Sequence, residues 1–164
     1  MSYAPELEIM VDILFVLYLI WVSWQDYKSM EVVRYSHLTG LLAIVLQLFL
    51  QVILHNVVAN GMMEKVIAGL LACLMLLVMQ IAACFMRLYG VADGIVFFLC
   101  GLFMIAEEGA QGFIQSFLWL TAVSGVLLLV VQAMKGNLKG VGLKHPVPYI
   151  PYISFAFILT KWVL

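Results

Sequence analysis

The sequence predicts an all-α membrane protein with about six transmembrane helices, and two observations carry that prediction. First, 66% of the 164 residues are hydrophobic and only 10% are charged, with a mean hydropathy of +1.14. Too few polar side chains remain to coat a soluble domain. Second, the apolar residues gather in runs close to the roughly 20 residues with which a helix crosses a bilayer. We therefore expect one membrane-embedded domain over residues 1–164, with no nucleic-acid partner.

The first three apolar runs cover residues 9–24, 38–54 and 66–86. Each has about the length of a membrane-spanning helix. Each also ends where polar chain begins, for example at Gln25 after the first run and at Arg87 after the third. These three runs are therefore expected to be separate helices joined by short polar loops.

The last three apolar runs cover residues 94–106, 113–134 and 149–164. The run at 94–106 is short for a span, but counting from Tyr89 gives a tilted spanning helix. The run at 113–134 has full spanning length. A basic segment at 135–145 separates it from the last run, and we expect that segment to be a flexible cytoplasmic loop.

Basic residues indicate the orientation, because they separate by loop. Six follow the first, third and fifth runs, and two lie on the other side. The positive-inside rule makes the side with six cytoplasmic and places both termini outside. The six are Lys28, Arg34, Arg87, Lys135, Lys139 and Lys144, and the two are Lys65 and Lys161. The acidic residues on the outer side are expected to be solvated or interfacial charges: Glu6, Glu8, Asp12, Glu64, Glu107 and Glu108.

Asp26 and Asp93 differ from those outer acids, because each lies at the cytoplasmic edge of an apolar run. A carboxylate at the edge of hydrocarbon is unfavourable, so a pair of them indicates a functional site. Two carboxylic acids within hydrogen-bond reach can share one proton, so that one activates water while the other polarises a peptide carbonyl. This is aspartic protease chemistry, and it needs no metal or cofactor. Helix dipoles favour the charge on Asp93, at a helix start, over Asp26, at a helix end.

Each aspartate also has a purely structural explanation. Asp93 precedes a predicted helix and could cap its N-terminus. Asp26 could form an ion pair with Lys28 or Arg34 at the membrane interface. Residue types and spacing alone leave these readings open beside the catalytic one.

The remaining candidate residues indicate no further site. No metal centre is predicted, because Cys73, Cys84 and Cys100 lie inside apolar runs without a histidine at ligand spacing. Ala68 and Ala72 form a small-xxx-small pair that suits close helix packing, within one chain or in a homo-oligomer.

Three segments carry a recognisable pattern together. Segment 26–33 begins with an aspartate, followed by the basic Lys28 and a short loop. Segment 90–93 reads Gly-Val-Ala-Asp and is similar to the motif GxGD. Segment 147–152 reads Val-Pro-Tyr-Ile-Pro-Tyr and places an aromatic residue between two prolines ahead of the last helix. With six spans and both acids on the cytoplasmic side, the chain resembles the type IV prepilin peptidases, membrane aspartic proteases of the GxGD class.

The resemblance implies an aspartic endopeptidase of a prokaryotic inner membrane, which removes the leader peptide of prepilins or pseudopilins at the cytoplasmic face. The chain resembles a short form without the methyltransferase-associated region, so peptidase activity without N-methylation is expected. By the resemblance Asp26 and Asp93 are catalytic. The residues it implies around them, shaping the active site or the substrate groove, are Gly90, Ala92, Lys28, Pro148 and Pro151.

The chain departs from the family's pattern at three places. Ala92 stands where the family has glycine, and alanine resists a positive φ. Ile95 stands where a lysine is often found, and segment 32–34 lacks the family's proline. Two other functions are therefore retained as alternatives. One is an inactive pseudopeptidase that binds pilin-like leaders, and the less favoured one is a small transporter that couples to protons or cations through the two aspartates.

Overall fold

The chain folds into helices, with one very short β-hairpin. The computed structural model describes residues 4–54, 62–85, 90–139, 142–143 and 147–163. Arg87, Tyr89 and Lys144, which the sequence placed in loops or at helix ends, lie outside the described residues. The elements are α1 (Ala4–Ser29), α2 (Ser36–Leu54), α3 (Met62–Phe85), α4 (Val91–Met134), β1 (Leu138–Lys139), β2 (Gly142–Leu143) and α5 (Ile150–Trp162).

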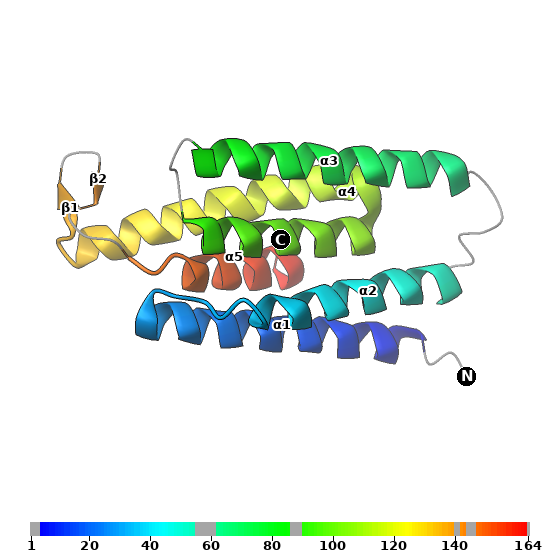
Figure 1. Cartoon of the computed structure of the whole chain (residues 1–164), viewed down its shortest axis with the longest axis horizontal. Coiled ribbons are helices and arrows are strands. Elements are labelled where there is room, and N and C mark those ends of the chain that lie inside the picture. Colours follow the sequence, from blue (N-terminus) through cyan, green and yellow to red (C-terminus); the bar gives the residue numbers. More distant parts are fainter. Residues whose placement is uncertain (1–3, 55–61, 86–89, 140–141, 144–146, 164) are drawn as a thin grey trace.

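Helix α4 is two helices joined at a sharp turn. Gly109 interrupts it with φ 75° and ψ −178°, a backbone conformation that residues with a Cβ rarely adopt. The second half, 110–134, runs back in the opposite direction to the first half, 91–108 (Figure 1). The expected runs at 94–106 and 113–134 lie on either side of this glycine. The prediction of six helical segments is therefore confirmed.

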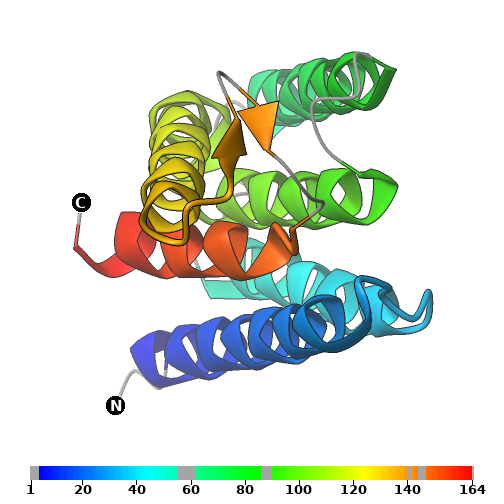
Figure 2. The same cartoon turned by 90° about the vertical axis from the view of Figure 1, so that its left-hand side faces the viewer.

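The helices pack around α4 and α5. Helix α4 contacts α2, α3 and α5, and α1 contacts α2 and α5; Figure 2 shows this bundle from one end. Three phenylalanines from three helices meet at its centre. The ring of Phe15 stacks on Phe103 at 4.2 Å between centroids and lies 5.1 Å from Phe157. This aromatic contact joins α1, the first half of α4 and α5.

The outward faces of the helices are also apolar. Large hydrophobic side chains such as Trp21, Leu70 and Leu118 are 58%, 65% and 61% exposed. Two helical stretches among the described residues, Glu6–Ser29 and Gly112–Met134, have the length and hydropathy to cross a membrane, and apolar stretches in α2 and α3 are shorter. Six membrane spans remain a prediction.

The segment after α4 contains a short hairpin. Gly136, with φ 65°, ends the helix, where its N–H donates to the carbonyl of Ala133. The strands β1 and β2 then pair antiparallel, with Leu138 opposite Leu143. The sequence did not predict this short hairpin within the segment, and the expected flexibility of the loop stays a prediction.

Gly40 allows α2 to approach α1 closely. A Cβ at Gly40 would lie 2.7 Å from a ring carbon of Tyr18, which is 3% exposed and hydrogen-bonded to His37 Nδ1 at 3.1 Å. We expect Gly40→Ala to lower the free energy of unfolding by about 1–3 kcal/mol, measured by denaturation in detergent, because the enclosed ring cannot move aside.

Gly69→Ala is the matched control for Gly40→Ala. No described atom lies within 4 Å of a Cβ at Gly69, and α3 is helical there. Alanine should therefore stabilise that helix by about 0.5–1 kcal/mol. Equal changes at the two glycines would contradict close packing of α2 on Tyr18.

Candidate active site at one end of the bundle

Asp26 lies in the last turn of α1 and is buried, with 6% exposure. Its Oδ2 accepts a hydrogen bond of 3.0 Å from the backbone N–H of Ile150, the first residue of α5. The first N–H groups of a helix have no partner within it, and they carry its positive dipole end. Asp26 therefore caps α5 from a different helix, and this N–H stabilises its ionised form.

The structure does not support the ion-pair explanation for Asp26. Lys28 and Arg34 are exposed, and within the described part of the chain neither of them pairs with Asp26. The turn after α1 is held instead by Gln25, whose side chain accepts from Val33 N at 2.9 Å and donates to Ser36 Oγ at 2.9 Å. Lys28, which the resemblance assigns to active-site shaping, points to the surface.

Asp93 lies in the first turn of α4, ahead of the apolar run that begins at Gly94. Gly90 is the N-cap residue, and its N–H donates to Asp93 Oδ2 at 2.9 Å. The capping explanation for Asp93 is thus partly confirmed, although the carboxylate reaches back from the third helical position instead of occupying the N-cap. This contact fixes the orientation of the side chain.

The glycine pattern around Asp93 does not serve the purpose expected from the sequence. Gly90 has φ −72°, and Ala92 is a helical residue without a positive φ. The expectation that alanine at this position meets backbone strain is therefore wrong. A Cβ at Gly90 would lie 3.2 Å from Asp93 Oδ2, so glycine there leaves room for the carboxylate.

The fold brings the two aspartates to the same end of the bundle. Figure 1 shows the end of α1, the start of α4 and the start of α5 at that end. The pKa of Asp93 is raised to about 6, mainly by burial; the hydrogen bond from Gly90 acts in the opposite direction, and the Asp26 carboxylate adds a smaller upward contribution. The Asp26 carboxylate therefore disfavours ionisation of Asp93.

Tyr149 is a third component of this region, and sequence reasoning missed it. Its ring lies edge-to-face against the ring of Phe97, with 5.8 Å between the centroids. Phe97 lies one helical turn after Asp93 in α4, on the same face of that helix. Its hydroxyl lies 3.2 Å from Ser124 Oγ, which is fully buried. The position of Tyr149 between two prolines was the available signal, but nothing in the sequence pairs it with Ser124.

The two prolines line a groove next to Asp26. Pro148 and Pro151 face a hollow of about 610 Å³ between α1, the end of α4 and α5. Pro151 is in the first turn of α5, as proline's fixed φ favours. The other residues lining the groove are mostly apolar: Tyr27, Met30, Leu127, Val131, Gln132, Lys135, Val147, Tyr152 and Phe155.

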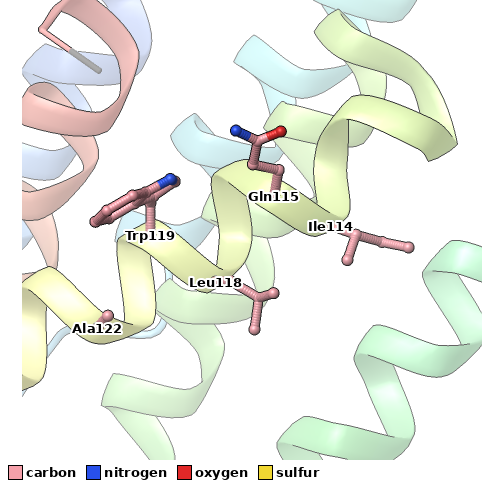
Figure 3. Close-up of a pocket in the computed structure, with 5 residues that line it drawn as sticks. All are labelled: Ile114, Gln115, Leu118, Trp119 and Ala122. Atoms are coloured by element: carbon pink, nitrogen blue, oxygen red, sulfur yellow. The ribbon is translucent and has the colours of Figure 1, made fainter.

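A second hollow, of about 570 Å³, lies away from the aspartates. The residues that line it come from the second half of α4 alone and include no acid or base (Figure 3). They are Ile114, Gln115, Leu118, Trp119 and Ala122. This surface has none of the groups that acid–base chemistry requires, so the candidate active site is the region of Asp26 and Asp93.

Two of the acids that were expected to be solvated or interfacial charges, Asp12 and Glu107, pair with Lys161 far from that site. Lys161 Nζ lies 2.7 Å from Asp12 Oδ1 and 2.5 Å from Glu107 Oε2. The side chains of Lys161 and Asp12 are 11% and 12% exposed, and that of Glu107 is 31% exposed. Asp12 and Glu107 are therefore members of a mostly buried ion cluster that joins α1, α4 and α5, and not solvated surface charges.

Comparison of the chain with protein-family models, with curated proteins and with solved structures found no match. Among the described residues, no group of three or more histidine, cysteine, aspartate and glutamate side chains is arranged to hold a metal ion.

Proposed function

We propose that the protein is a membrane-embedded aspartic endopeptidase that cleaves the leader peptide of prepilins or pseudopilins at the cytoplasmic face of a prokaryotic inner membrane. One observation carries the proposal: Asp26, at the end of α1, and Asp93, at the start of α4, lie at the same end of the bundle, and backbone N–H groups hold each of them. A coupled pair of carboxylates is the minimal apparatus for attack of water on a peptide bond.

Location in a membrane is supported by what the helices expose. Only 28% of the apolar window in Glu6–Ser29 and 17% of that in Gly112–Met134 is buried, whereas the core helix of a soluble protein is mostly buried. The stretch Glu6–Ser29 also contributes Phe15 and Leu19 to the core. An apolar exterior of this extent suits contact with lipid. We propose six spans with both aspartates on the cytoplasmic side, as the basic residues indicate.

In the proposed reaction Asp26 is the base and Asp93 the acid. The N–H of Ile150 and the dipole of α5 favour negative charge on Asp26, and Asp93 is the partner that retains a proton. Asp26 takes a proton from water, the oxygen attacks the peptide carbonyl, and Asp93 donates its proton to the carbonyl oxygen. The sequence alone favoured the negative charge on Asp93, from the dipoles of the helices that carry the two acids. We place it on Asp26 instead, because the positive end of the α5 dipole lies against Asp26.

An inactive pseudopeptidase is the second candidate, and one observation favours it. Oδ2 of each aspartate already accepts an N–H from the start of a helix, so both side chains have a structural role that needs no catalysis. A pseudopeptidase would still bind a pilin leader. A transporter is less favoured, because both acids lie at helix ends.

Processing of a co-expressed prepilin distinguishes the candidates. The substrate is a prepilin encoded in the same genome, and its leader is followed by mass spectrometry of the intact pilin. We expect the wild-type protein to remove the leader. An uncut prepilin that nevertheless co-purifies with the folded protein would support the pseudopeptidase, and neither cleavage nor association would remove both candidates.

Cleavage should weaken as the pH rises above about 6. The pKa of Asp93 is raised to about 6, above its ordinary value of about 3.9, so its proton is held at pH 5 and lost through pH 6–7. Once both acids are ionised, the proton donor is absent. We expect kcat/KM of the purified enzyme in detergent to fall about tenfold per pH unit above that value. A flat profile between pH 5 and 8, with the helical signal unchanged, would contradict the assignment of Asp93 as the acid.

A further inference from the structure

Tyr149 contacts each structural part of the candidate site. Its peptide link to Ile150 supplies the N–H that binds Asp26 Oδ2 at 3.0 Å. Its ring packs on Phe97, on the same face of α4 as Asp93. Its hydroxyl meets Ser124 Oγ, at 3.2 Å, in the second half of α4. One residue thus connects the start of α5 with both halves of α4 and with the end of α1.

We propose that Tyr149, held by Ser124, is the positioning residue that keeps the start of α5 against Asp26 and so sets which acid is ionised. The inference rests on the proposed function, because the acids must act as a pair for their relative ionisation to matter. Tyr149 acts through the backbone N–H of Ile150, and no contact of its side chain with substrate is required.

The contacts of Ser124 and Tyr149 suit this role. Ser124 is fully buried, and its Oγ also lies 3.1 Å from the carbonyl of Thr121, so its position is fixed by its own helix. A tyrosine phenol is protonated near neutral pH, so the Tyr149 hydroxyl can donate a hydrogen bond as well as accept one.

The hydrogen bond from Ile150 N–H stabilises the ionised form of Asp26 more than its protonated form. A donor to a charged group contributes about 1.5–3 kcal/mol, more than a donor to a neutral group. If the start of α5 shifts, Asp26 loses that donor in the state in which it must act as base. The reaction then slows even though the substrate surface is unchanged, so kcat should respond and KM should not.

Tyr149→Phe and Ser124→Ala test the inference, because each removes the same hydrogen bond from a different side. The assay is prepilin cleavage by the purified full-length protein, with kcat and KM measured between pH 4 and 8. We expect kcat to fall about tenfold in both variants, with KM changed less than about twofold. The acid limb of the kcat profile should also move to higher pH, because ionised Asp26 has lost a donor.

Tyr18→Phe is the matched control. Tyr18 is buried, and among the described residues its side chain has one hydrogen bond, 3.1 Å to His37, so its loss costs comparable stability without touching the start of α5. Unchanged kcat and pH profile in Tyr149→Phe and Ser124→Ala, with an active wild type, would overturn this inference alone. So would an equal loss in Tyr18→Phe, which would indicate general destabilisation. An inactive wild type would remove the proposed function, and this role with it.

Discussion

Asp26→Asn and Asp93→Asn should each abolish prepilin processing, with a loss of at least about 1,000-fold in rate. Asparagine can neither accept nor release the proton that the reaction moves, and acid–base groups of this kind contribute factors of about 10²–10⁴. The structure indicates that these substitutions remove the acid–base group without removing its hydrogen bond to the backbone. An asparagine oxygen at position 26 can still accept from Ile150 N, and one at position 93 from Gly90 N, so both helix caps survive.

Glu31→Gln is the matched control for these two variants. Glu31 is an exposed acid just beyond α1, so it undergoes the same change of charge near the same end of the bundle. It should process prepilin at the wild-type rate, as judged by the mass of the mature pilin. If either aspartate variant kept full activity while remaining folded, the pair would be structural and the protease proposal would fail. Loss of cleavage with retained prepilin binding is the pattern that the proposal requires.

Lys161→Met should lower the free energy of unfolding by about 3–5 kcal/mol. The substitution retains the apolar stem but leaves the carboxylates of Asp12 and Glu107 without their shared cation. Breaking a buried ion pair from one side carries a penalty of this size, because the remaining charge is uncompensated. The ammonium also lies 4.9 Å from the centre of the Phe103 ring, a contact that methionine loses as a cation–π interaction. Denaturation in detergent measures the change.

Two companion variants separate charge from packing in this cluster. Adding Asp12→Asn and Glu107→Gln to Lys161→Met should recover most of the lost stability, because no unpaired charge then remains. Lys135→Met removes an exposed lysine and should change stability by less than about 1 kcal/mol. A loss at Lys161 no larger than that at Lys135 would mean that the cluster is solvated, as the sequence alone suggested.

The positions of the helices were largely predictable, because local patterns carry that information. Each of the six apolar runs lies mainly within a helix, and Pro151 is in the first turn of α5, where proline is tolerated. The hairpin after α4 was missed, because its strands are only two residues each and no alternating apolar pattern marks them. The sequence predicted a boundary between two helices near Gly109. It did not predict that the chain reverses direction there, which depends on the φ of 75° at Gly109.

The candidate site was predictable as a pair of residues but not as an arrangement. Charge in an apolar sequence was enough to select Asp26 and Asp93, because such groups are rare at the edge of a span. Their surroundings depend on α5, which lies more than a hundred residues after Asp26 in the chain. No pattern near Asp26 predicts that the N–H of Ile150 will bind it, or that Ser124 will meet Tyr149.

The sequence by itself determined the helical class, the approximate helix ends and which acids are unusual, because hydropathy, proline and glycine act through their near neighbours. Only the tertiary structure decided what each charge contacts. In the fold, Lys161 lies between Asp12 and Glu107, which the sequence alone indicated to be ordinary surface charges. The fold also places the first N–H of α5 against Asp26. Desolvation and hydrogen bonding depend on groups that packing brings close together. Residues that are far apart in the sequence can be neighbours in the fold, and local sequence patterns do not predict which ones will be.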